Sequence, residues 1–150
     1  MENPHRIDDR TGFLIGRAAR VMAHSLNREF HNAGYQLTVD HWIVLSKLLH
    51  EGGQKQQHLS AETGSDKTTI TRLIDFMEEQ RWVYRQPDEQ DRRNKLTYLT
   101  AEGQSLQYDL SLIVDRFNQQ IEEQLDDQEL QTCKKVLNDI FRIVGSQRSA

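Results

Sequence analysis

Residues 58–103 read HLSAETGSDKTTITRLIDFMEEQRWVYRQPDEQDRRNKLTYLTAEG, and two successive patterns in them point to the fold. In the first half of this stretch, apolar residues recur every three or four positions, which is the period of a helix that buries one face. They are Ile70, Leu73, Ile74 and Met77. Ser65 or Asp66 is suited to cap this helix. After residue 80 the pattern changes, because RWVYRQP and KLTYLT are rich in β-branched and aromatic residues and flank the polar loop 88–94. The stretch therefore predicts a helix followed by a β-hairpin with a long tip.

Helical periodicity continues on both sides of this stretch. Before it, we expect a helix at about 7–32, a second helix that starts after Thr38, and a short helix at 56–64. After it, we expect two long helices from Ala101 onward, separated near Asp126. This order predicts a mainly α fold with a small β-hairpin wing. Its middle part is a helix-turn-helix followed by the hairpin, which together form a winged helix-turn-helix.

The composition predicts a soluble, cytoplasmic protein. Charged residues make up 28% of the 150 residues, and the net charge is −4. This balance is typical of a folded domain rather than a disordered polyelectrolyte. No apolar run approaches the ~20 residues that a membrane-spanning helix needs, and the opening MENPHRIDDR lacks the apolar segment of a signal peptide. Cys133 is the only cysteine, and its place on an apolar helical stripe predicts an inert core residue.

The helix at 65–80 carries its polar groups in an order that suits DNA binding. The residues that lie opposite the apolar face or on its flanks belong to the first half of the helix. They are Ser65, Thr68, Thr69, Thr71 and Arg72. A recognition helix that enters the major groove with its N-terminus needs hydroxyls and cations there, and tolerates carboxylates only at the far end. An ordinary amphipathic helix with a polar outer face would look the same, so the helix alone leaves both interpretations open.

The hairpin tip favours the DNA-binding interpretation. Arg92 and Arg93 are adjacent in the polar loop. No single ion-pair partner there would require both of them. A long guanidinium side chain on a protruding tip suits the narrow minor groove, where the negative potential is focused. Asp91 lies close enough in sequence to hold the Arg93 guanidinium in one orientation. A solvated turn is the alternative for an isolated arginine pair, but a recognition-like helix just before the loop makes it less favoured.

The same stretch resembles the signature region of the MarR family of winged-helix transcription regulators. The resemblance rests mainly on DRRNKLTYLTAEG at 91–103, which is similar to the family's wing motif. In that motif an Asp-Arg pair is followed by Leu-Thr and then Gly, and Leu99, Thr100 and Gly103 take these places. The number and order of the flanking helices also fit the family, so the resemblance covers nearly the whole chain.

Membership of this family would imply a homodimer. The first and the last two helices of each chain would interlock, and the two winged domains would read a pseudo-palindromic site on double-stranded DNA. The chain, 1–150, would then be one unit. Its DNA-binding part would lie at about 36–100, and its dimerisation helices at about 7–32 and 101–146.

The resemblance also implies roles for single residues. Arg93 would enter the minor groove, braced by Asp91, while Arg92 and Lys95 would contact phosphate. The major-groove surface would comprise Ser65, Lys67, Thr68, Thr69, Thr71 and Arg72. The chain departs from the family at Arg81, where the family usually has Gly before the first wing strand. A left-handed conformation at Arg81 would cost on the order of 1 kcal/mol.

A ligand site is suggested by residues of the first helix. Regulators of the MarR type often bind small aromatic acids in a crevice between the dimer helices and the winged domain. Arg17, Arg20 and His24 share one side of the first helix and are suited to receive a carboxylate, with Trp42 as an apolar wall. Ion pairing with the acidic C-terminal helices of a partner subunit explains the same residues equally well.

Other classes of function find little support in the sequence. The six histidines are scattered over several elements, so we expect neither a metal site nor a cofactor. No catalytic triad or glycine-rich phosphate loop is recognisable, so an enzyme is not expected. The preferred interpretation is a sequence-specific DNA-binding repressor released by a small aromatic or anionic ligand. The alternative is a winged helix that serves as a protein-interaction module, which would not need Arg92 and Arg93 at its tip.

Overall fold

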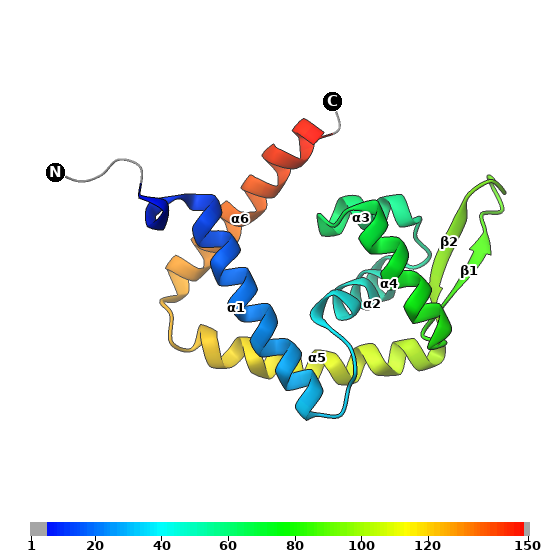
Figure 1. The fold of residues 1–150 in the computed structure, drawn as a ribbon, viewed down its shortest axis with the longest axis horizontal. Helices are drawn as coiled ribbons and strands as arrows, with labels where there is room; N and C mark the ends of the chain where they lie inside the picture. Colours follow the sequence, from blue (N-terminus) through cyan, green and yellow to red (C-terminus); the bar gives the residue numbers. More distant parts are fainter. Residues whose placement is uncertain (1–5, 149–150) are drawn as a thin grey trace. The chain divides into compact units, whose positions relative to one another are not determined.

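The computed structural model describes residues 6–148. Outside this range lie residues 1–5 and 149–150. The segment MENPHRIDDR, which lacks the features of a signal peptide, falls partly within residues 1–5. The described part contains six α-helices, one short 3-10 helix and one two-stranded antiparallel sheet (Figure 1). This confirms the predicted mainly α fold with a small wing. None of the described helices could span a membrane.

The chain divides into two compact units, and the first ends at Val39. It contains the 3-10 helix η1 (Ile7–Asp9) and the long helix α1 (Thr11–Asn32). The helix predicted from about residue 7 is therefore interrupted, because Arg10 has an extended backbone with ψ 125°. Leu26 and Phe30 are buried on α1, as the apolar spacing requires. Other apolar residues of the same helix stay exposed: Leu14, Val21 and Met22.

The helix-turn-helix of the second unit comprises α2 (Val39–Glu51), α3 (Gln56–Thr63) and α4 (Lys67–Glu79). Its core is made of aliphatic side chains that are almost fully buried, as the helical spacing predicts. They are Val44, Leu45, Leu48, Leu59, Ile70, Ile74 and Met77, whereas Leu73 is only half-buried. The His41 ring lies 5.0 Å from the Phe76 ring. Burial lowers the pKa of His41, and the nearby Asp40 partly opposes this shift.

The wing consists of β1 (Val83–Pro87) and β2 (Lys95–Leu99), paired from Val83–Leu99 to Pro87–Lys95. Its loop, 88–94, is the one that the sequence predicts. A third short segment was not predicted: Gln54 pairs with Thr97 through two backbone hydrogen bonds of 3.0 and 2.8 Å. Gly53 makes this pairing possible, because a Cβ at this position would lie 2.3 Å from the Tyr98 ring.

The end of α4 is a Schellman motif, which directs the chain into the wing. The backbone N–H of Arg81 donates to the Glu78 carbonyl at 3.0 Å, and that of Trp82 donates to the Met77 carbonyl at 2.9 Å. This geometry requires a left-handed residue, and Arg81 has a φ of 64°. Among the described non-glycine residues it alone has a positive φ. Arg81 therefore adopts the left-handed conformation whose cost was considered from the sequence.

Replacing Arg81 with Gly should therefore stabilise the fold. The left-handed backbone costs an L-residue about 1 kcal/mol, and part of that gain is lost because Gly makes the unfolded chain more flexible. We expect a net gain of roughly 0.5 kcal/mol and a slightly higher thermal midpoint by circular dichroism. Arg81→Ala is the matched control, since it removes the guanidinium but keeps the strain. If the Ala variant gains as much as the Gly variant, backbone strain is not the cause.

Two long helices, α5 (Ala101–Glu122) and α6 (Asp127–Arg148), complete the second unit. The Thr100 hydroxyl accepts a hydrogen bond from the backbone N–H of Gly103 at 3.0 Å and so caps α5. Asp126 accepts one from the backbone N–H of Glu129 at 2.9 Å at the start of α6, which confirms the predicted break there. The apolar residues of α6 are mostly exposed within this chain, among them Val136, Leu137, Phe141 and Val144.

The expectation that Cys133 lies in the core is wrong. The thiol is exposed, because the stripe of α6 to which Cys133 belongs is not covered by the described part of the chain. The apolar spacing identified the correct face of the helix. It could not reveal that no segment within residues 6–148 covers that face.

Candidate nucleic-acid interface

The start of α4 is held by a side-chain cap. Asp66 Oδ1 accepts a hydrogen bond from the backbone N–H of Thr69 at 2.7 Å, so of the two predicted candidates, Ser65 and Asp66, it is Asp66 that caps the helix. Hydrogen bonds from Thr69 lower the pKa of the Asp66 carboxyl, with a smaller contribution from Arg72. The cap fixes the N-terminal turn of α4, where the helix dipole contributes positive potential.

Substitutions of Asp66 should distinguish the contribution of the capping hydrogen bond to stability from that of the carboxylate charge. Because its folded-state pKa is lowered, the carboxylate stabilises α4 above its ordinary pKa of about 3.9, and this stabilisation is lost as the pH falls through the lowered pKa. Asn keeps the cap without titrating, whereas Ala removes it. Between about pH 5 and 3 we expect the thermal midpoint of the native protein to fall more steeply than that of Asp66→Asn. At neutral pH, Asp66→Ala should have the lowest midpoint of the three. Equal pH slopes for native and Asn proteins would contradict the assignment.

The predicted major-groove residues differ in how accessible they are. Lys67, Thr68 and Arg72 are exposed, whereas Ser65, Thr69 and Thr71 are half-buried. The Thr71 hydroxyl donates to the Lys67 carbonyl at 2.9 Å and accepts from Gln56 Nε2 at 3.1 Å. These two bonds favour a packing role for Thr71. A base contact by any of the six residues stays a prediction.

The wing tip is organised around Asp91. Its Oδ1 accepts from both the backbone N–H and the Nε of Arg93, each at 3.2 Å. Its Oδ2 accepts from Asn94 Nδ2 at 3.1 Å. The Arg93 side chain is nevertheless 92% exposed, so one end of the guanidinium is held while the rest faces solvent. The brace that the sequence suggests is thus present, and its role in DNA binding stays a prediction.

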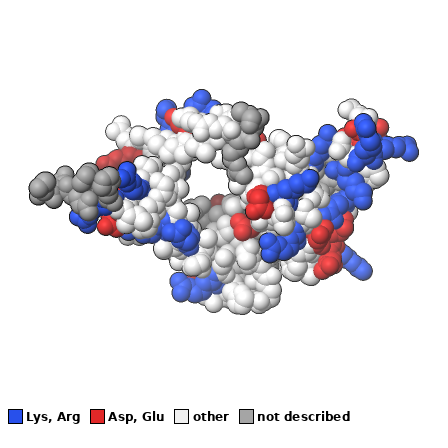
Figure 2. Space-filling view, turned by 45° about the horizontal axis from the view of Figure 1, so that its top comes forward, with Lys and Arg blue, Asp and Glu red and all other residues white. Residues whose placement is uncertain are grey.

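Positive charge gathers at this end of the molecule. Arg92 and Lys95 are exposed beside Arg93, and Figure 2 shows Lys and Arg concentrated over the wing, interrupted by a few acidic groups. The hairpin projects beyond the helices of its unit (Figure 1). A hairpin that projects in this way can carry its cations into a groove of a duplex while α4 occupies the neighbouring groove.

One polar residue at the base of the wing was missed by the sequence analysis. Arg85 lies on β1 with a side chain that is only 15% exposed. It forms ion pairs with Asp75 and Glu78 of α4. The negative charges of these two carboxylates, which lie in the C-terminal half of α4, are therefore partly neutralised. The signal that could have revealed Arg85 is a cation on the inward-facing side of a short strand.

The proposed ligand residues lie in different units of the chain. Arg17, Arg20 and His24 are exposed on α1, and the Arg17 guanidinium lies 5.0 Å from the centre of the Phe13 ring. Trp42 belongs to the second unit, where its Nε1 donates to Ser111 Oγ at 3.0 Å. The grouping of these four residues into one crevice stays a prediction.

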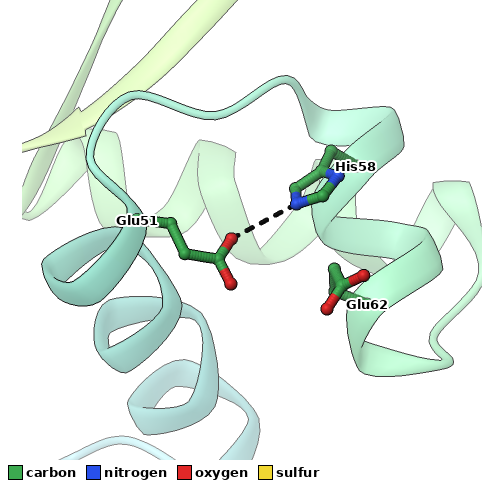
Figure 3. Close-up of side chains that lie close together, drawn as sticks. All are labelled: Glu51, His58 and Glu62. Carbon is green, nitrogen blue, oxygen red and sulfur yellow. Dashed lines mark hydrogen bonds and ion pairs between the residues drawn. The ribbon is translucent and has the colours of Figure 1, made fainter.

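A cluster of charged side chains joins the end of α2 to α3. His58 Nε2 lies 3.2 Å from Glu51 Oε2, and Glu62 faces the same space (Figure 3). Glu51, His58 and Glu62 could each supply one ligand atom to a metal ion. However, Lys47 Nζ already lies 3.5 Å from a carboxylate oxygen of each glutamate. We interpret the cluster as an exposed ion-pair network between the two helices. The spacing of His58 and Glu62, which places both on one side of a helix, was its only sign in the sequence.

Comparison with known proteins agrees with this architecture. The MarR family model matches residues 37–95. The solved structure of CouR from Rhodococcus jostii RHA1, bound to p-coumaroyl-CoA, is 30% identical, with 91% of this chain and 95% of that chain covered and a TM-score of 0.79. A MarR family transcriptional regulator from Rhodococcus sp. RHA1 is 29% identical, with 91% and 96% covered and a TM-score of 0.80.

A relative from Bacillus subtilis (strain 168) matches over a similar length. It is the uncharacterized HTH-type transcriptional regulator YwoH, which is 27% identical over 89% of this chain and 92% of its own. YwoH and the protein from Rhodococcus sp. RHA1 are described as transcriptional regulators, and the family is one of regulators rather than enzymes, as expected from the sequence. From the winged helix-turn-helix, the family model and the relatives, it follows that this chain belongs to the MarR family of DNA-binding transcriptional regulators.

Proposed function

We propose that the protein is a homodimeric repressor that binds a pseudo-palindromic site on double-stranded DNA and is released by a small ligand. The observation that carries this proposal is the Asp91-braced, exposed Arg93 at the tip of the wing, in the same unit as α4, whose N-terminal half presents Lys67, Thr68 and Arg72. In this arrangement α4 reads base edges in the major groove and Arg93 lies in the adjacent minor groove. Arg92 and Lys95 contribute phosphate contacts, which provide affinity without sequence preference.

The proposed dimer rests on the exposed apolar side chains of α1 and α6. Val21 of α1 is 62% exposed, and Phe141 and Val144 of α6 are 47% and 51% exposed. Helix faces that expose large apolar side chains in this way are rarely left in water and usually mark association surfaces. Two copies of the winged unit related by a two-fold axis would read the two halves of a pseudo-palindrome, about one helical turn apart.

The proposed effector is an aromatic acid or its coenzyme A thioester. The relative CouR was solved with p-coumaroyl-CoA, and its similarity to this chain supports a ligand that combines an aromatic ring with anionic groups. Arg17 and Arg20 provide exposed guanidinium groups that suit a carboxylate or a phosphate. Trp42 provides the apolar wall in this proposal.

Selection from a random DNA library tests the function. The proposal predicts enrichment of one site with two-fold symmetry, bound by two chains as measured by light scattering. Aromatic acids and their coenzyme A thioesters are then titrated onto the preformed complex, and one class should release the DNA. Arg17→Ala with Arg20→Ala should resist release while DNA affinity stays unchanged. A library without any enriched site would instead favour the protein-interaction module.

A further inference from the structure

Arg85 makes three side-chain hydrogen bonds to residues of two helices, whereas the contacts of Asp91 stay within the wing tip. The Nη1 of Arg85 donates to Glu78 Oε1 at 3.0 Å, its Nη2 to Asp75 Oδ1 at 2.5 Å, and its Nε to Gln56 Oε1 at 3.0 Å. Every nitrogen of the guanidinium is thus engaged, and the side chain is largely shielded from water. These contacts join β1 to α3 and α4.

Gln56 extends the network into the DNA-facing half of α4. Its Oε1 accepts from Arg85, and its Nε2 donates to Thr71 Oγ1 at 3.1 Å. Thr71 in turn donates to the Lys67 carbonyl in the first turn of α4. A continuous chain of hydrogen bonds therefore runs from the wing strand to the end of α4 that is expected to meet DNA.

The geometry of the guanidinium matters for this link. Arginine presents its donors in a rigid, planar fork, so several contacts fix the orientation of the group as well as its position. A lysine would supply the same charge from one atom and could not hold three elements at fixed angles. The two-stranded hairpin is supported on its β2 side by the short pairing of Gln54 with Thr97, and since a hairpin alone is marginally stable in water, contacts that hold β1 add to its stability.

We propose that Arg85 is a positioning residue that sets the angle of the wing relative to the recognition helix α4, so that Arg93 and α4 reach the same duplex together. This inference rests on the proposed DNA-binding function. It assigns Arg85 no contact with DNA. Its effect on binding is exerted through Arg93, because a wing that pivots at its base moves its tip the farthest.

A double-mutant cycle on DNA affinity tests the proposal. In the native background, Arg93→Ala should weaken specific binding by about tenfold. In the Arg85→Gln background, the same substitution should weaken binding by at most about twofold, because the wing is no longer held in place. Arg72→Ala on α4 is the matched control and should cost the same in both backgrounds. Full additivity of Arg85→Gln with Arg93→Ala would overturn the proposal and leave Arg85 a purely stabilising residue.

A second variant tests the proposal in case Arg85→Gln does not fold. Glu78→Gln removes one carboxylate from the exposed side of the network and leaves Arg85 in place. It should reduce the effect of Arg93→Ala in the same direction but by less. Circular dichroism and the thermal midpoint of each variant show whether the fold is intact. If Arg85→Gln unfolds and Glu78→Gln leaves the Arg93 effect unchanged, the proposal fails.

A measurement without DNA separates this proposal from the proposed function. Spin labels are placed at Glu89→Cys on the wing loop and Gln57→Cys on α3, in a Cys133→Ser background, and the protein is diluted into excess unlabelled chain. The native sequence should give a narrow distance distribution, and Arg85→Gln a clearly broader one. Unchanged width would overturn the positioning role even if DNA binds. Broadening in a protein that binds no specific DNA would uphold the positioning of the wing and refute the function.

Discussion

Replacement of Arg93 with Ala is expected to weaken binding to the specific DNA site by about tenfold or more, which corresponds to roughly 1.4 kcal/mol. The Arg93 side chain is exposed at the wing tip and is held at its Nε by Asp91, so little conformational entropy is lost when it enters a groove. The narrow minor groove concentrates negative potential around such a group. The salt dependence of binding should also become shallower, with a slope reduced by about 1.

Arg116→Ala is the control for this experiment. Arg116 is exposed on α5, outside the wing, and its removal changes the net charge by the same amount. Hydroxyl-radical footprinting adds a local measurement, because minor-groove protection should be lost only in the Arg93 variant. If both variants weaken binding equally, the effect is one of overall charge, and the wing has no special role.

Gly103→Ala is expected to destabilise the fold more than the other substitutions considered. A Cβ at Gly103 would lie 2.0 Å from the backbone carbonyl oxygen of Trp82. This atom belongs to the main chain, so it cannot move aside as the end of a flexible side chain does. The first turn of α5 would have to shift away from the base of the wing. We expect a loss of about 3 kcal/mol or more in the free energy of unfolding, measured in urea.

Gly12→Ala is the matched control. Gly12 lies in the first turn of α1, and a Cβ there would meet nothing within 4 Å. Ala is the better helix former, so this variant should be neutral or more stable by up to about 1 kcal/mol. A loss at Gly12 as large as the loss at Gly103 would show that the close contact with Trp82 does not explain the effect.

The elements of this fold could be predicted because each has a strong local signal. The apolar spacing of Ile70, Ile74 and Met77 matches a buried helix face, and the change to β-branched residues after residue 80 marks the wing. The cap of α4 could be narrowed to Ser65 or Asp66 from the local sequence, whereas the unusual position of Arg81 was noticed only through the resemblance to the family.

Features that depend on residues distant in sequence could not be predicted. The pairing of Gln54 with Thr97 has no local signature, and the three contacts of Arg85 come from residues of two helices. Cys133 was placed in the core because periodicity identifies an apolar face without revealing what covers it. Within the site, the sequence named Arg93 and its brace, but it could not show that the Thr71 hydroxyl is already engaged.

The most direct test of the account is fluorescence anisotropy with the promoter DNA upstream of the gene that encodes this protein. The native protein is titrated against that duplex and a scrambled duplex of equal length, at two salt concentrations. We expect tight binding of two chains per site on the promoter. We also expect weak binding to the scrambled duplex, with a preference for the promoter that persists at the higher salt. Suppose instead that the protein binds both duplexes with equal affinity, and that both affinities fall in parallel as the salt concentration rises. That result would contradict sequence-specific regulation by this protein.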